Sequence, residues 1–228
     1  MKIVYSYHGG IPSEFLLKMA ELSFLLVRNY TEYPIELWVD KANRKYFRMP
    51  YDSVVESNFG FPRDEYWNLS KMYVYAQQTE PFLHIDFDTC VMPGFQIPQG
   101  DIVCEKIRKI EMDNEYKKHT IDAPIYEEIV CSGFLGGNNY GDLFRQQYEW
   151  AEACACAEGK PTYKNLISLE EVSFTQRVRQ FNKCIETLNS DTFLHFWCRR
   201  EWNKEDVYGK VVDELLDFNR QARNGIII

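Results

Sequence analysis

The amino-acid sequence predicts a single α/β domain, with a mostly parallel central sheet flanked by helices. The chain opens with a β-prone run at 3–7, a Gly-Gly stop, an amphipathic helix at 15–28 and a second strand at 34–39. This β–α–β order is typical of parallel sheets. The 228 residues suffice for one domain with a full core, and 45% hydrophobic and 15% aromatic content indicates a folded chain.

The later elements follow the same alternation of apolar and amphipathic segments. We expect further strands at 82–88, 101–106 and 192–197 and further helices at 64–78, 140–157, 169–181 and 206–223. The segments 41–63 and 107–124 carry no firm element. Three glycines fall within five residues in the stretch 132–139, so we expect the backbone there to turn or to approach a neighbour closely.

Composition and missing motifs exclude several classes of function. A net charge of −8 argues against a general nucleic-acid or anionic-membrane surface. The N-terminal apolar run is too short for a signal peptide, and no segment approaches the ~18 apolar residues of a membrane span. Seven cysteines without a CxxC pair indicate reduced thiols, so we expect a cytoplasmic protein of unassigned oligomeric state. GxGxxG, Walker A, GxSxG and HExxH motifs are absent.

The most informative stretch is an apolar strand that ends in two carboxylates, Asp86 and Asp88. Side chains two apart share a face of a strand, so His84 points the same way but lies deeper, where we expect it to be a hydrogen-bonded support. Two carboxylates at this spacing repel each other unless a cation lies between them, and oxygen ligands suit magnesium or manganese. The alternatives are an acidic strand exit on the surface, or a metal-dependent phosphoesterase, which usually has more ligands than this chain offers.

The order of the motifs resembles GT-A-type glycosyltransferases, and in particular small bacterial sugar-nucleotide-dependent members. The motifs are Lys71, His84-Ile-Asp-Phe-Asp88, Ser132-Gly-Phe-Leu-Gly-Gly137 and His195, spread over most of the chain. The resemblance implies a GT-A-like (Rossmann-like) sheet with a nucleotide-binding half at 1–106 and an acceptor half at 107–228. It also implies transfer of a sugar from a nucleotide-sugar donor, for which we expect a UDP-sugar, to a glycan or other hydroxyl acceptor.

The resemblance assigns a metal site to Asp86, Asp88 and His195. Asp88 would be a direct ligand, Asp86 would share the metal or hold the ribose, and His195 would be the third ligand. The cation would neutralise the leaving diphosphate, and an imidazole ligand favours Mn²⁺ over Mg²⁺. The alternative for His195 is an ordinary hydrogen-bonded histidine in an apolar strand.

The same resemblance suggests residues that bind the nucleotide. Lys71 would lie near the phosphates or the first aspartate, although it could equally be a solvated helix lysine. Similar families place a lysine soon after the late histidine to bind the diphosphate, and here Arg199 or Arg200 would replace it. Tyr7 and Asp40 lie at the ends of the first two strands, where parallel sheets carry their ligand site. Tyr7 could lend its backbone or ring to the base, and Asp40 could contact the base or ribose.

The acceptor side is assigned to the second half of the chain. Gly136 and Gly137 would let the backbone approach the sugar, or would only serve a tight turn. Glu171 or Glu170 would be the general base of an inverting enzyme, or would merely favour the start of a helix. A GT-A-shaped protein that binds a sugar nucleotide or glycan without turnover is the competing function.

Overall fold

The computed structural model describes residues 1–59, 67–109, 128–158, 168–196 and 204–223. Its centre is a seven-stranded sheet in the order β10-β6-β9-β4-β1-β2-β3, in which β9 alone runs antiparallel to its neighbours. The strands are β1 (Lys2–Tyr7), β2 (Ile35–Asp40), β3 (Ser53–Ser57), β4 (Phe82–Ile85), β6 (Ile102–Cys104), β9 (Phe134–Gly137) and β10 (Ile185–Thr187). The predicted mostly parallel α/β architecture is confirmed.

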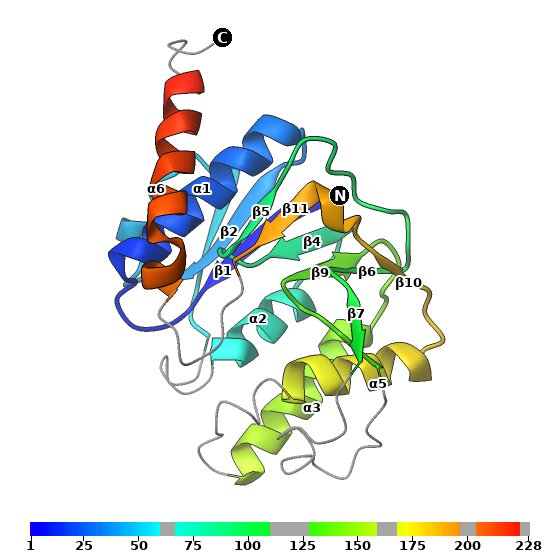
Figure 1. Cartoon of the computed structure of the whole chain (residues 1–228). Helices are drawn as coiled ribbons and strands as arrows, with labels where there is room; N and C mark the ends of the chain where they lie inside the picture. The colour runs from blue at the N-terminus through cyan, green and yellow to red at the C-terminus, as the bar shows by residue number, and fades with distance from the viewer. Residues whose placement is uncertain (60–66, 110–127, 159–167, 197–203, 224–228) are drawn as a thin grey trace.

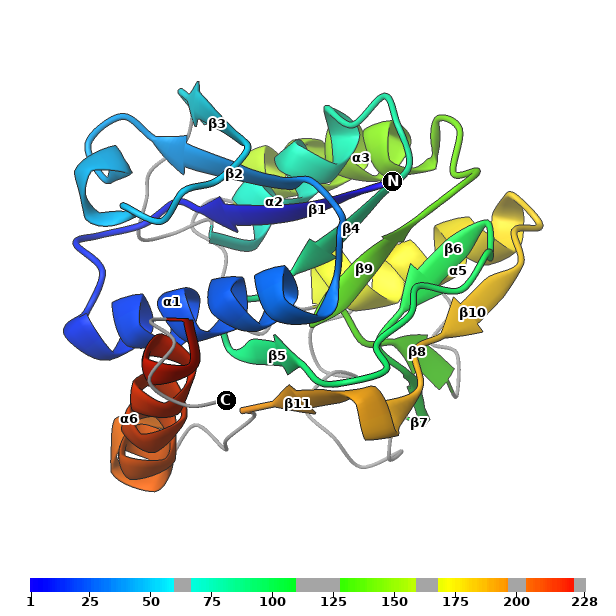
Figure 2. The same cartoon turned by 90° about the horizontal axis from the view of Figure 1, so that it is seen from above.

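Helices cover both faces of this sheet (Figures 1 and 2). One face carries α1 (Glu14–Tyr30) and α6 (Lys204–Arg223), and the other carries α2 (Trp67–Ala76), α3 (Leu143–Glu158) and α5 (Ser173–Gln180). Side chains alternate along β1 to serve the two layers: Ile3 and Tyr5 join the core beneath α1, whereas Val4 joins the core beneath α2 and α3. No described helix has the length and apolar character needed to cross a membrane.

Two small antiparallel ribbons complete the described part. The first pairs β5 (Thr89–Val91) with β11 (Phe193–His195) on the α1 side of the sheet, and His195 lies opposite Thr89. The second pairs β7 (Ile107–Lys109) with β8 (Glu128–Val130). The β5–β11 ribbon returns the late segment of the chain to the end of β4.

Most elements of the opening half match their predicted positions, and the departures have physical reasons. The 41–63 segment contains edge strand β3, whose side chains are half-buried or exposed, so its apolar signal is weak. Of the two alternatives expected for the 132–139 stretch, a turn or a close backbone approach, the structure has the second, because residues 134–137 form strand β9. The expected close backbone approach is confirmed, since a Cβ on Gly136 would lie 2.0 Å from the Phe82 carbonyl oxygen, and one on Gly137 would lie 2.0 Å from that of Asp101.

The close strand packing at Gly136 leads us to expect that any side chain there destabilises the folded protein. Gly136→Ala should lower the free energy of unfolding by about 3 kcal/mol, because the new methyl group collides with backbone that cannot move away. Chemical denaturation measures the change. Gly209→Ala on α6 is the matched control, since its Cβ meets nothing closer than 3.7 Å; it should stabilise by about 0.5–1 kcal/mol. Equal stability of the Gly136 variant and the wild type would contradict this packing.

Candidate active site

The candidate site lies where β4 ends and the chain turns into β5. The Asp86 backbone N–H donates to the Gly133 carbonyl at 3.0 Å. The Thr89 N–H and hydroxyl both donate to the Asp86 carbonyl, at 3.0 Å and 2.6 Å. This short turn fixes the backbone between the two predicted carboxylates, Asp86 and Asp88, at the carboxyl edge of the sheet.

Asp86 belongs to a buried cluster built around the ammonium group of Lys71. Lys71 Nζ lies 3.0 Å from Asp86 Oδ1 and 3.0 Å from Glu170 Oε1, and the Tyr75 hydroxyl donates to the same Glu170 oxygen at 3.4 Å. Burial lowers the pKa of Lys71, but the two carboxylates outweigh it and hold the pKa well above its usual value. Burial raises the pKa of Asp86 to about 6, opposed by Lys71, and raises that of Glu170. Lys71 is therefore a buried, ion-paired cation and not a solvated helix lysine.

His84 lies behind this cluster, as predicted. Its Nε2 is 2.8 Å from the Ser6 hydroxyl, and its Nδ1 is 3.7 Å from Asp86 Oδ1, beyond hydrogen-bond length. Burial, together with the charge of Lys71, lowers its pKa well below the usual value, so the imidazole is neutral. A neutral ring hydrogen-bonded to a strand hydroxyl supports the site without bringing further charge into it.

Asp88 faces a second cluster, contributed by three distant parts of the chain. His195 Nε2 lies 3.7 Å from Asp88 Oδ1, Lys204 forms an ion pair with Asp88 Oδ2, and His195 Nδ1 lies 2.8 Å from Glu105 Oε2. Burial raises the pKa of Asp88, but His195 and Lys204 hold it well below its ordinary value. Burial also lowers the pKa of His195, yet the two carboxylates raise it to about 9. His195 is thus an imidazolium at neutral pH in the metal-free protein.

The predicted metal ligands separate into two groups. Asp88 Oδ1 and His195 Nε2 face each other. The other ring nitrogen, Nδ1, is hydrogen-bonded to Glu105 Oε2, an arrangement that is common for histidines that bind metals. This pair fits a divalent cation that accepts oxygen and nitrogen ligands. Asp86 is instead engaged by Lys71. Among the described residues, no three His, Cys, Asp or Glu side chains converge as a ready ligand set.

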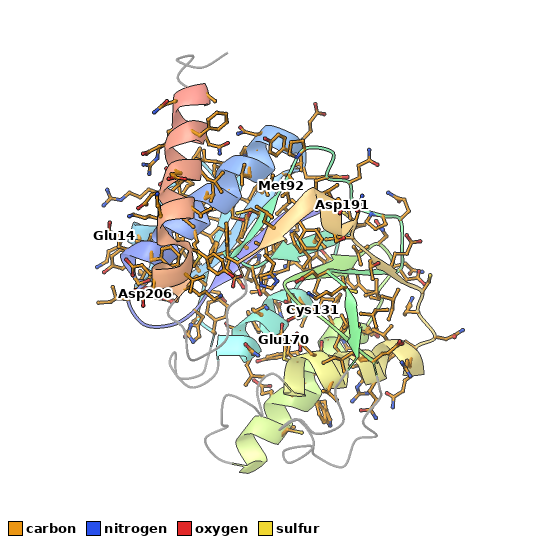
Figure 3. All side chains as sticks on the ribbon, in the orientation of Figure 1. Glu14, Met92, Cys131, Glu170, Asp191 and Asp206 are labelled. Carbon is orange, nitrogen blue, oxygen red and sulfur yellow. The ribbon has the colours of Figure 1, made fainter. Side chains whose placement is uncertain are left out.

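Glu170 and Glu171, the two candidate bases, lie on a short π-helical turn (Ser168–Val172) that precedes α5. Figure 3 labels Glu170 beside α2, whose Lys71 and Tyr75 it contacts. Glu171 Oε1 accepts from the Ser132 backbone N–H at 3.4 Å. Both side chains are buried. Short π-helical turns of this kind are frequently found at functional sites.

The other predicted site residues are more dispersed. The Tyr7 hydroxyl donates to the Gly10 carbonyl at 2.9 Å, and the buried Asp40 carboxylate accepts from the backbone and side-chain N–H groups of Asn43 at 3.1 Å and 2.8 Å. Both lie at carboxyl strand ends, as expected. Gly136 and Gly137 have no side chain, and this allows the backbones of neighbouring strands to approach them closely. Arg199 and Arg200 lie outside the described residues.

Sequence reasoning missed two charged members of the site, Glu105 and Lys204. Glu105 follows the buried strand β6 directly, at the same edge of the sheet as Asp86, so the rule used for the acidic pair would also have found it. Lys204 begins α6 and carries no local signal, because only tertiary packing brings it to Asp88.

The buried cluster predicts that Lys71 contributes strongly to stability. Lys71→Met should lower the free energy of unfolding by about 3–5 kcal/mol, because the buried Glu170 and the half-buried Asp86 would both lose their cation. Adding Glu170→Gln to Lys71→Met should restore part of the loss. Lys18→Met, which removes an exposed ion pair with Asp213, is the control and should change little. Thermal and urea unfolding report both effects; a Lys71 variant as stable as the wild type would contradict the cluster.

Solved structures with the same fold include two kinds of transferase. The glycosyltransferase GlyE of Streptococcus pneumoniae TIGR4 superposes with a TM-score of 0.52 at 10% identity, over 99% of this chain and 64% of GlyE. This chain therefore spans less than two thirds of that protein. The inositol-1-phosphate CTP transferase of T. maritima superposes with a TM-score of 0.52 at 12% identity, over 97% of both chains. At these identities the likeness establishes a shared fold.

The sequence itself has one clear affiliation. Comparison with curated proteins gives no match. One protein-family model, described as "Family of unknown function (DUF6734)", matches residues 5–158. This range runs from the second half of β1 to the end of α3, and so includes the acidic strand end, Lys71, Glu105 and the β9 glycines. The chain therefore belongs to the DUF6734 family.

Proposed function

We propose that the protein is a metal-dependent glycosyltransferase that moves a sugar from a nucleoside-diphosphate sugar to a hydroxyl acceptor. One observation carries the proposal: Asp88 and His195 face each other at 3.7 Å, at the carboxyl edge of a parallel sheet, with Glu105 behind the imidazole. An oxygen and a nitrogen ligand in this position suit a cation that receives a diphosphate.

The proposed cofactor is Mn²⁺, or Mg²⁺, held by Asp88 and His195. When bound, the cation supplies positive charge to the departing diphosphate. The other charged residues act around it: Lys204 brings an ammonium group to the same carboxylate, and Lys71 holds Asp86 in place beside it, for a shared role at the metal or the ribose. Ammonium groups at this edge suit phosphate oxygens.

The acceptor side of the proposal rests on Glu170 and Glu171. An inverting transfer needs a carboxylate that removes the acceptor proton, and burial raises the pKa of Glu170 toward the range in which a base works well. Glu171 is held by the Ser132 N–H and is the alternative base. Tyr7 and Asp40, at the ends of β1 and β2, are the proposed contacts for the base or ribose of a UDP-sugar.

The proposal predicts turnover that depends on Asp88 and His195. With Mn²⁺ and a panel of UDP- and GDP-sugars, the wild type should release nucleoside diphosphate, and Asp88→Asn and His195→Gln should each lower the rate by at least roughly 100-fold. Asp191→Asn, an exposed carboxylate in a turn, is the matched control and should retain full activity. Release of nucleoside diphosphate in the absence of any divalent cation, or release that survives Asp88→Asn, would contradict the proposal.

Nucleotidyl transfer is the second candidate, because the inositol-1-phosphate CTP transferase matches over 97% of both chains. The products separate the candidates. Sugar transfer releases a nucleoside diphosphate from a nucleotide sugar, whereas nucleotidyl transfer releases pyrophosphate from a nucleoside triphosphate. A protein that binds UDP-sugar without releasing either product would be a binding protein instead.

A further inference from the structure

We propose that Glu105 is a positioning residue: its buried carboxylate holds His195 by Nδ1 and thereby directs Nε2 toward Asp88. The inference rests on the proposed function, because it names the residue that orients one ligand of the proposed metal site. It concerns a residue that acts through His195 and does not itself touch the cation.

Backbone pairing fixes where Glu105 stands. It follows β6 directly, and its N–H donates to the Phe134 carbonyl of β9 at 3.0 Å. Its side chain is only 1% exposed, and Oε2 lies 2.8 Å from His195 Nδ1. His195 arrives from the opposite direction, on β11, through its pairing with β5. The central sheet, which carries Glu105, and the β5–β11 ribbon, which carries His195, thus bring the carboxylate and the imidazole into contact.

This contact determines the orientation of the ring. The two nitrogens of an imidazole lie on different sides of the ring, so anchoring Nδ1 on Glu105 leaves Nε2 toward Asp88 Oδ1, 3.7 Å away. The carboxylate also fixes which nitrogen keeps its proton when the other meets a cation. A ring without this anchor could rotate or present the wrong nitrogen.

Two further residues, Cys131 and Lys106, contact the Glu105 carboxylate and help to fix its position. The Cys131 thiol donates to Oε2 at 3.4 Å, and Lys106 Nζ lies 3.4 Å from Oε1. Both carboxylate oxygens therefore have partners, which offsets the cost of burying the charge.

Gly133 gives independent support from the local packing. A Cβ at this position would lie 2.3 Å from Glu105 Oε2 and 2.9 Å from His195 Cε1. The absence of a side chain is what lets the carboxylate and the imidazole meet. The carbonyl of the same glycine accepts from the Asp86 N–H, so one residue leaves space for the Glu105–His195 pair and anchors the neighbouring acidic turn.

The first test observes the ring directly, in metal-free protein, by ¹H–¹⁵N NMR of the histidine side chains. The His195 signals are assigned by their loss in His195→Gln. The wild type should show a downfield, slowly exchanging Nδ1 proton, and Glu105→Gln should shift it upfield or abolish it, because an amide accepts more weakly and can donate instead. Glu128→Gln, the same change at an exposed carboxylate on β8, should leave it unchanged. An unaltered Nδ1 signal in Glu105→Gln overturns the proposal.

The second test measures Mn²⁺ affinity by the loss of free-ion signal in electron paramagnetic resonance. Glu105→Gln should weaken binding by roughly 10–100-fold, and Gly133→Ala should weaken it similarly, with Glu128→Gln as the control. Circular dichroism confirms that each variant folds. Wild-type affinity in folded Glu105→Gln overturns the inference. If the wild type itself binds no Mn²⁺, the proposed metal site fails, and the NMR comparison still decides whether Glu105 positions His195.

Discussion

The candidate site depends on the short antiparallel pairing of β5 with β11. Each strand has three residues, yet their register sets His195 opposite Thr89 and gives the Phe196 N–H a hydrogen bond of 2.8 Å to the Asp88 carbonyl. Without this ribbon, the acidic turn after β4 would stand at the sheet edge with no imidazole beside it. The ribbon is packed under α1, where the Ser23 hydroxyl donates to the Thr89 carbonyl at 2.6 Å. The packing of the ribbon against α1 thus helps to position the acidic turn.

Charge compensation is the second constraint on the site. Asp86 and Glu170 share the ammonium of Lys71, while Asp88 and Glu105 share the imidazolium of His195. Carboxylates removed from water need a nearby cation, and each of the two predicted aspartates has one in its own cluster. Lys204 adds a cation to the second cluster. A divalent cation at Asp88 would enter a region that already balances its own charges, and it would compete with both a proton and a lysine.

The sequence predicted the parts of the site that depend on local pattern. The period of two along β4 placed His84 behind the aspartates, and the strand-end rule placed Asp86 and Asp88 at the sheet edge. Contacts between distant segments were not predictable in the same way. Nothing in the sequence around Lys71 indicates that Glu170 completes its cluster, because that pairing arises from the packing of α2 against the π-turn before α5. A run of glycines in a sequence is compatible both with a turn and with a strand whose backbone lies close to its neighbours. The glycines of β9 are of the second kind, because side chains there would collide with the backbones of adjacent strands.

The central claim is that Asp88 and His195 hold a cation that receives a diphosphate. A crystal structure with Mn²⁺ and UDP, with anomalous diffraction recorded for manganese, tests it most directly. We expect one anomalous peak between Asp88 Oδ1 and His195 Nε2, next to the diphosphate oxygens, with Glu105 still on His195 Nδ1. A bound nucleotide with no manganese peak at these two residues, or with its diphosphate elsewhere on the sheet edge, would show that they do not form the metal site.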